Sequence, residues 1–172
     1  LHLDGLADSS DGLLPAMPVE RRFDAMSDPR VGAFGAIAVA VVVVVRLAGF
    51  ASAAASATAI AGLWCASRSA AAVVALTVPY ARAHGLASAF VPAGRDVRRA
   101  AVVAGTGLLL AVPLVLVDRP AAGITALAVQ LGVIAGVTAF AVRRIGGYTG
   151  DVLGASIVLG ETAGLLALAA RW

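Results

Sequence analysis

The sequence predicts an all-α polytopic membrane protein, a bundle of about five transmembrane helices preceded by an acidic helix. Of its 172 residues, 60% are hydrophobic and only 13% are charged, and the mean hydropathy is +0.95. Soluble domains have about a quarter of their residues charged, so this composition excludes a single water-soluble domain. The length also excludes a large multidomain protein.

Five apolar runs are long enough to cross a bilayer, because a hydrocarbon core of about 30 Å needs roughly 20 helical residues. They cover residues 33–51, 58–79, 99–117, 121–142 and 150–170. Strands of a membrane barrel would alternate polar and apolar residues, whereas the run from Val41 to Val45 is continuously apolar. We therefore expect all five runs to be helices.

The segment before the first run differs in kind. Residues 1–31 hold six of the ten acidic residues, and Pro18 suits the first turn of a short helix that ends near Met26. We interpret residues 1–172 as one membrane-embedded domain, with a cytoplasmic acidic segment over 1–31 and membrane helices with short loops over 32–172. The opening residues do not have the pattern of a signal peptide, and we expect the chain to begin part-way through a longer protein.

The thirteen basic residues are all arginine, and their distribution predicts the orientation. Short loops rich in arginine face the cytoplasm, so we expect a multi-pass protein of the cell inner membrane with its N-terminal segment and its active site on the cytoplasmic side. That side receives Arg21, Arg22, Arg30, Arg82, Arg95, Arg98, Arg99, Arg143 and Arg144, and the other side receives Arg119 and Arg171. Because these arginines do not form one patch, we expect no nucleic-acid partner.

Asp4, Asp8 and Asp11 form the first candidate site, because their spacing places them on one face of a helix. Three neighbouring carboxylates repel one another unless water or a cation neutralises them, and oxygen ligands suit Mg²⁺. A solvated acidic surface is the alternative. Gly, Leu, Ala and Ser lie between the acids where a surface helix would have Lys, Glu or Gln, which favours the metal site. The isolated His2 and His84 are not expected to be ligands.

The second candidate site is Gly146-Gly147-Tyr148-Thr149-Gly150-Asp151, at the start of the last apolar run. Thr149 suits a helix N-cap, and free amides at a helix start attract phosphate oxygens. Asp151 would instead hold a metal that bridges to those oxygens. The alternative is that Gly150 and Gly154 form a packing motif of small residues. Both can hold, because packing of this helix would bring Asp151 toward the acidic face.

Charged residues also occur inside the apolar runs, where a charge is costly unless it is paired or faces a cavity. Arg68 and Glu161 either contact substrate or form an interhelical hydrogen bond, and the sequence leaves both alternatives open. Arg82 adds a cation on the side of the acids. Cys65 is the single cysteine, so no intramolecular disulfide and no CxxC motif exist.

These motifs together resemble the cobalamin synthase family, the adenosylcobinamide-GDP ribazoletransferases. The resemblance rests on LHLDGLADSSDGL at 1–13, MSDPRVGAFG at 26–35, PYAR at 79–82, GLASAF at 85–90 and GGYTGDVLGA at 146–155. It runs nearly end to end, although Ser9-Ser10 replaces a Thr-Ala-like pair. Family members are longer, which implies that further membrane helices precede Leu1.

The resemblance implies an enzyme of late vitamin B12 biosynthesis that joins adenosylcobinamide-GDP to α-ribazole or its 5′-phosphate, releases GMP and requires Mg²⁺. The metal-binding and catalytic acids would be Asp4, Asp8, Asp11 and Asp151. The substrate-binding residues would be Arg30, Arg68, Arg82, Gly147, Tyr148, Thr149 and Gly150. Expected partners are these two small molecules, the lipid bilayer, and further copies of the chain or other corrinoid-pathway enzymes.

Two other functions remain open from the residues alone. A phosphotransferase of the CDP-alcohol type also uses clustered aspartates, but it follows DGxxAR with GxxxDxxxD, and that tail is absent here. A transporter would thread ionisable residues through the bilayer. An enzyme would gather them at one surface, so their placement distinguishes the two.

Overall fold

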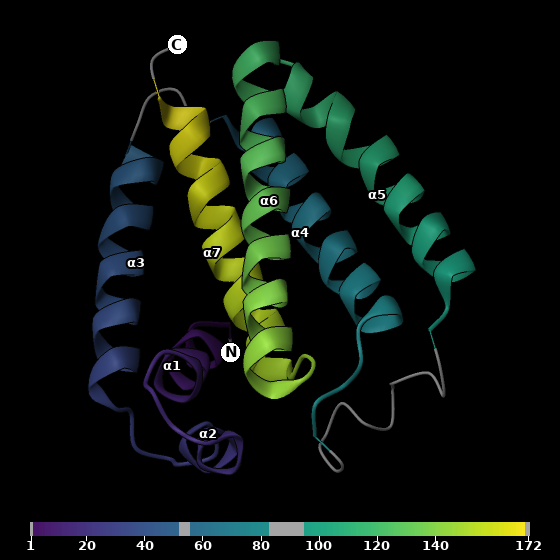
Figure 1. The fold of residues 1–172 in the computed structure, drawn as a ribbon. Helices are drawn as coiled ribbons and strands as arrows, with labels where there is room; N and C mark the ends of the chain where they lie inside the picture. The colour runs from purple at the N-terminus through teal and green to yellow at the C-terminus, as the bar shows by residue number, and fades with distance from the viewer. Residues whose placement is uncertain (1, 52–55, 83–94, 171–172) are drawn as a thin grey trace.

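The computed structural model describes residues 2–51, 56–82 and 95–170, which form an all-helical bundle (Figure 1). The helices are α1 (His2–Leu13), α2 (Val19–Ala25), α3 (Ala33–Ala51), α4 (Ala57–Thr77), α5 (Val97–Leu116), α6 (Pro120–Ile145) and α7 (Gly150–Ala169). Five of them, α3 to α7, are long and apolar enough to cross a membrane. The predicted fold class is therefore confirmed. The predictions for His84 and for GLASAF at 85–90 lie outside the described residues.

The helices begin and end close to the predicted limits, with α6 as the main exception. The sequence assigned Arg143 and Arg144 to a loop, but both belong to the last turn of α6. Cations are favourable there because the carbonyl end of a helix carries partial negative charge. The helix ends where Gly146 adopts a left-handed conformation with φ of 78°, and the loop to α7 is correspondingly short.

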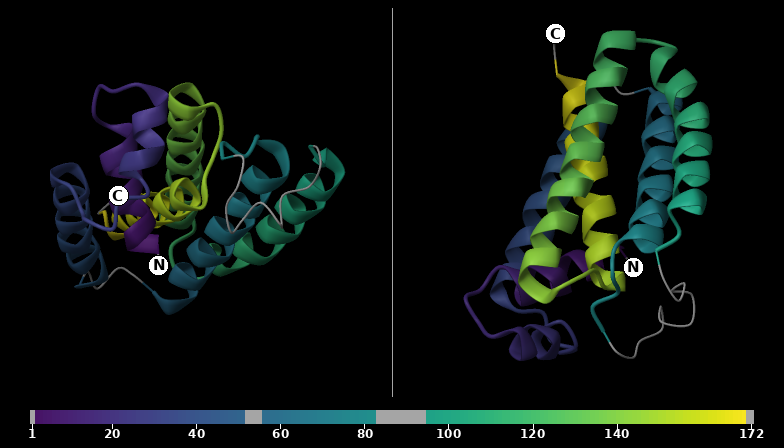
Figure 2. Two further views of the ribbon diagram at one scale, coloured as in Figure 1. Left: turned by 90° about the horizontal axis from the view of Figure 1, so that it is seen from below. Right: turned by 45° about the vertical axis from the view of Figure 1, so that its right-hand side comes forward.

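α7 is the central helix of the bundle. In its apolar window 67% of the residues are buried, against 17% in α3, which fits a lipid-facing position for α3. α7 packs against α1, α3, α4 and α6, whereas α4 and α5 form a pair that extends to one side (Figure 2). Small side chains such as Ala126 and Ala155 fill the core and let the backbones approach closely.

α1 lies across one end of α3 and α7, and α2 lies beside it (Figure 1). Leu6, Ala7 and Leu13 of α1 are buried. The buried Arg22 of α2 donates hydrogen bonds from Nη1 to the carbonyl oxygens of Gly12 and Leu13, at 2.8 and 3.0 Å. Carbonyls at a helix C-terminus have no partner within their own helix, so α2 caps α1 and holds the acidic helix in place.

Candidate active site

The contact between α1 and α7 brings the two predicted acidic motifs together. It is close because residue 5 is glycine: a Cβ on Gly5 would lie 2.8 Å from the carbonyl oxygen of Asp151. Asp8, one turn along α1, therefore lies within the electrostatic reach of Asp151 and of Asp4. The predicted approach of Asp151 to the Asp4–Asp8 face is present in the structure.

The carboxyl group of Asp8 has a strongly altered acidity. Its pKa is raised from 3.8 to about 6, first because partial burial disfavours the charged form and then because Asp151, Asp4 and Asp11 are negative neighbours. Arg82 acts in the opposite direction. Ionised carboxylates held this close create a local negative potential that a bound cation would relieve.

Asp11 is oriented differently from the other acids. Its Oδ2 accepts a hydrogen bond from the amide of Gly32 at 2.7 Å, and its Oδ1 accepts one from the amide of Gly35 at 2.9 Å. These amides belong to the start of α3. The sequence identified Asp11 by its spacing alone, and spacing does not show that both of its oxygens contact another helix.

The loops that precede α7 and follow α4 are paired with each other. The amide of Ala81 donates to the carbonyl of Tyr148 at 2.8 Å, and the amide of Tyr148 donates to the carbonyl of Pro79 at 3.0 Å. The rings of Tyr80 and Tyr148 also meet edge to face, with their centroids 5.3 Å apart. PYAR and GGYTG, two motifs far apart in the sequence, therefore form one structural unit.

This pairing places Arg82 beside Asp151. Nη2 of Arg82 lies 3.4 Å from Oδ2 of Asp151, and the guanidinium lies 6.0 Å from the ring centroid of Phe23. The Nε and Nη2 atoms of Arg82 are buried and make no hydrogen bond among the described residues. Buried donors are nearly always satisfied in native proteins, and among the described residues Nε of Arg82 has no acceptor while Nη2 has only the ion pair with Asp151.

The glycine-rich motif is mostly packed inside the protein. Tyr148 and Thr149 are 1% and 0% exposed, and Gly147 is also buried, whereas Gly150 is exposed at the start of α7. Thr149 Oγ1 accepts a hydrogen bond from the amide of Val152 at 3.2 Å, which confirms the predicted N-cap. These buried residues shape the loop that precedes α7.

Arg30 lies on the surface next to its own turn. Its guanidinium donates to both carboxylate oxygens of Asp28, with a shortest distance of 2.8 Å, and its side chain is 87% exposed. The hydrogen bonds from Arg30 lower the pKa of Asp28 to about 2. The structure does not bring Arg30 into contact with the acids of α1 or α7 among the described residues.

Arg68 meets Glu161 inside the bundle, as the interhelical alternative predicted. Oε1 of Glu161 accepts hydrogen bonds from Arg68 at 2.5 Å and from Ser67 at 2.7 Å, and Oε2 pairs with Arg46 at 3.3 Å. Helices α3, α4 and α7 are thus joined by an ionic cluster that includes Arg46 of α3. A cavity of about 320 Å³ borders this cluster and the first residues of α1.

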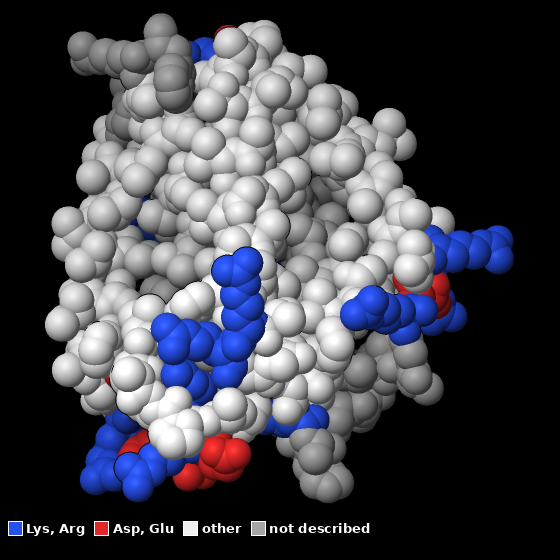
Figure 3. Space-filling model, viewed as in Figure 1, with Lys and Arg blue, Asp and Glu red and all other residues white. Residues whose placement is uncertain are grey.

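The charged residues inside the long apolar helices, Arg46, Arg68 and Glu161, pair with one another. The acids of the two motifs lie together at one end of the bundle. Most charged side chains on the face shown in Figure 3 also lie toward that end, and the body of the bundle is largely uncharged. This placement is typical of an enzyme that works at a membrane surface. It does not fit a transporter that threads charges along a pathway.

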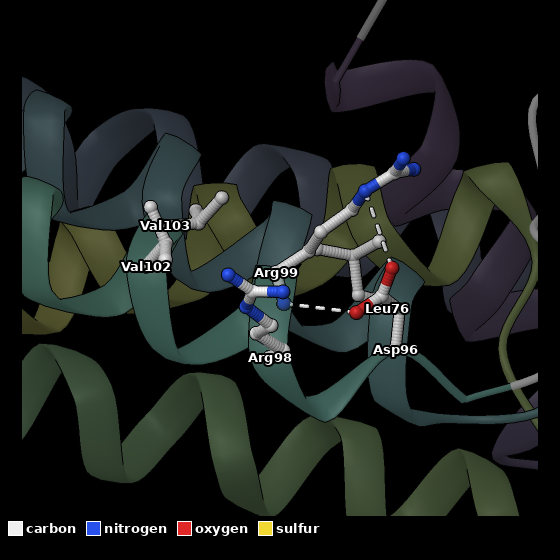
Figure 4. Close-up of a pocket in the computed structure, with 6 residues that line it drawn as sticks. All are labelled: Leu76, Asp96, Arg98, Arg99, Val102 and Val103. Carbon is white, nitrogen blue, oxygen red and sulfur yellow. Dashed lines mark hydrogen bonds and ion pairs between the residues drawn. The ribbon is translucent and has the colours of Figure 1, made fainter.

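Another cavity, of about 490 Å³, lies between α4 and α5 and contains none of the predicted site residues (Figure 4). Two of its ionic groups, Asp96 and Arg99, pair with each other. Asp96 accepts from the amide of Arg99 at 2.9 Å as the N-cap of α5, and its carboxylate pairs with Nε of Arg99 at 3.2 Å. We therefore place the candidate site at α1 and α7.

Among the described residues, no three His, Cys, Asp or Glu side chains are already arranged around one point as metal ligands. The donor set nevertheless suits a hard cation. Asp4, Asp8 and Asp151 supply only oxygen ligands, they repel one another, and Mg²⁺ takes few protein ligands while keeping several waters.

Sequence reasoning missed two contributors to the site. Arg22 was read only as an orientation signal, yet it is buried and caps α1. Phe23 carried no recognisable signal, and it lies beneath Arg82. The position of Arg22 in a short helix does not indicate from the sequence which carbonyl oxygens its side chain will contact.

Comparison with known proteins shows the family of the chain. The chain matches the family model described as cobalamin-5-phosphate synthase over residues 1–169. It is 35% identical to the adenosylcobinamide-GDP ribazoletransferases of Shigella flexneri and Escherichia coli strain K12, over 97% of this chain and 68% of each relative. The Brucella anthropi protein of the same name is 36% identical, over 98% of this chain and 66% of the relative. No solved structure gave a significant match. The chain therefore belongs to the cobalamin-5-phosphate synthase family.

Proposed function

We propose that this chain catalyses a late step of vitamin B12 biosynthesis. In this reaction adenosylcobinamide-GDP and α-ribazole, or its 5′-phosphate, are joined to give adenosylcobalamin or its 5′-phosphate, and GMP is released. Family membership over residues 1–169 supports this proposal. The relatives it resembles are named as adenosylcobinamide-GDP ribazoletransferases, which also supports it.

The observation that carries the proposal is the position of Arg82 beside Asp151 and within electrostatic reach of Asp8. A guanidinium with unsatisfied buried donors is suited to hold phosphate oxygens, because its planar fork makes paired charge-assisted hydrogen bonds. The exposed start of α7 at Gly150 lies next to it and offers backbone amides to a second oxygen. Together they fit a diphosphate better than a single carboxylate.

Asp4, Asp8 and Asp151 would hold Mg²⁺, in agreement with their oxygen-only chemistry and mutual repulsion. When bound, the ion would neutralise charge that develops on the transferred phosphoryl group. Asp11 is not needed in this set, because its oxygens already accept two amide hydrogen bonds.

The transfer exchanges one phosphorus–oxygen bond for another. A ribose hydroxyl oxygen bonds to the phosphorus that carries cobinamide and loses its proton, while the bridging oxygen leaves with the bond's electron pair as part of GMP. Phosphoryl transfer depends chiefly on positioning and on stabilisation of charge. Arg82 would supply both by orienting the diphosphate and by balancing the charge on the departing phosphate. No described group shows the paired nucleophile and base of covalent catalysis, so we propose direct transfer.

We further propose that the site faces the cytoplasm of a multi-pass membrane protein. The excess of arginines at the end that holds α1 and α2 supports this orientation. Arg30 and Arg68 remain predicted substrate contacts. Arg68 would act only on a ligand that reaches the cavity beside Glu161 and the start of α1.

The proposal is tested by GMP release from membranes that contain the chain, supplied with adenosylcobinamide-GDP, α-ribazole 5′-phosphate and Mg²⁺. We expect release that needs Mg²⁺, that Asp8→Asn abolishes and that Asp24→Asn leaves intact. Asp24 is a matched control because it is an exposed acid on α2. Equal loss in both variants, or release that EDTA does not affect, would contradict the proposal.

A further inference from the structure

Asp11 supplies a cap to a helix other than its own. Gly32 occupies the N-cap position of α3, because its carbonyl accepts the hydrogen bond from the amide of Ala36 at 3.0 Å. An N-cap side chain normally accepts from the first free amides of the helix, but glycine has no side chain. The carboxylate of Asp11 fills that role from α1, accepting from the amides of Gly32 and Gly35.

The space around residue 32 is matched to this carboxylate. A Cβ on Gly32 would lie 2.6 Å from Oδ1 of Asp11, and its three nearest atoms would all belong to the Asp11 carboxylate. Gly32 does not have a positive φ. Alanine at this position would therefore be tolerated by the backbone and would be excluded only by Asp11.

Both carboxylate oxygens of Asp11 have partners without a cation. Each accepts one backbone amide at the start of α3, the end of the helix that carries partial positive charge. Asp8 has a different environment, with Asp151 and Asp4 as its main charged neighbours. The three acids of α1 share a helix face, but they do not share a partner.

We propose that Asp11 is a positioning residue and not a metal ligand: it fixes α1 against α3 so that Asp4 and Asp8 face Asp151. The sequence predicted four metal-binding acids. In this proposal Asp4, Asp8 and Asp151 bind the ion, and Asp11 orients α1. The part of this inference that concerns the ion rests on the proposed function, whereas the cap itself does not.

A double-mutant cycle on the full chain in detergent tests the cap. We expect Gly32→Ala and Asp11→Ala each to lower the melting temperature, and the double variant to be no less stable than Asp11→Ala, because the clash disappears with the carboxylate. Asp11→Asn, which keeps one acceptor oxygen, should recover part of the loss. If Gly32→Ala left the melting temperature unchanged, or if the losses of the two single variants simply added in the double variant, the proposed cap would be wrong.

Binding of Mn²⁺, followed by electron paramagnetic resonance, tests the division of roles. We expect Asp11→Asn to bind within about threefold of the unaltered chain and Asp8→Asn to bind more than about tenfold more weakly. In the transfer assay Asp11→Ala should lower the rate about ten- to a hundredfold, and Asp11→Asn, which keeps one acceptor oxygen, should restore part of the rate.

If Asp11→Asn loses Mn²⁺ as fully as Asp8→Asn, the positioning role is wrong. If the unaltered chain binds no Mn²⁺, the metal dependence of the proposed function fails, and the cycle on Gly32 still decides whether Asp11 caps α3.

Discussion

The guanidinium of Arg82 lies 3.4 Å from the carboxylate of Asp151, although one residue follows α4 and the other begins α7. The backbone pairing of Pro79 and Ala81 with Tyr148 produces this proximity. The cation and the acid are therefore positioned by main-chain hydrogen bonds between the two loops.

Replacement of Arg82 by lysine should impair transfer. Lysine keeps the charge but loses the planar fork, so we expect kcat/KM for adenosylcobinamide-GDP to fall by about ten- to a hundredfold, a loss of about 1.4 to 2.8 kcal/mol. Steady-state GMP release measures the effect. Arg21→Lys is the control, because Arg21 is exposed on α2. An unchanged kcat/KM would exclude Arg82 from substrate binding.

Asp8 should make the stability of the metal-free protein depend on pH. Its folded pKa is about 6, above the ordinary 3.8, so the folded chain holds this proton more tightly than the unfolded chain does. The stability that Asp8 contributes is therefore full below about pH 4 and is lost as the pH rises through about 6. Thermal unfolding in EDTA between pH 4 and 8 measures this decline.

Two further measurements accompany that pH series. Asp8→Asn should flatten the decline, because the amide does not titrate. Mg²⁺ should restore stability above pH 6, since it binds the ionised site of the folded chain. A slope that is the same in Asp8→Asn would assign the pH dependence to another group.

Gly147→Ala should disrupt the paired loops, although the added methyl group would meet the loop backbone and not the acids. A Cβ on Gly147 would run into the backbone of Pro79 and Ala81. We expect the loops to separate and the transfer rate to fall about tenfold or more, because Arg82 would be displaced. Gly105→Ala is a matched control, since its Cβ would meet no atom within 4 Å. Equal rates in the two variants would show that the loop pairing is dispensable.

Glu161→Gln should destabilise the bundle more than it impairs chemistry. The change leaves Arg46 and Arg68 without their shared anion. Removal of one partner from a buried ion pair costs about 3 to 5 kcal/mol, which we reduce to about 2 kcal/mol because the Arg68 side chain is half-exposed.

The corresponding fall in melting temperature would be about 4 to 8 °C for a chain of this size. Glu20→Gln serves as the control, because it removes an exposed acid from α2. A large fall in kcat at an unchanged melting temperature would instead indicate that Glu161 contacts the substrate.

The long helices were predictable from the sequence because a hydrocarbon core imposes one length and one composition on each of them. The approach of Asp151 to α1 was also predictable, since both motifs lie on one side of the membrane and small residues favour close packing. The orientation of Asp11 was not predictable. Helical spacing gives the face on which Asp11 lies, but the partner of that face depends on where α3 begins, and neither Gly32 nor Gly35 signals a cap from another helix.

The same limit explains Arg22 and Arg46. An arginine near a helix end is typical both of a topology signal and of a structural hydrogen-bond donor, and the sequence contains thirteen of them. Only tertiary packing shows that Arg22 is buried against α1 and that Arg46 pairs with Glu161.

The central position of α7 determines where the chain can accept random substitutions. α7 packs against four other helices and most of its residues are buried, so a change that suits one neighbour disturbs another. Most of α3 is exposed on the surface of the described helices, where one branched apolar residue can replace another at little cost. A saturation library selected for function should therefore retain a narrow choice of amino acids along α7 and a broad apolar choice along α3.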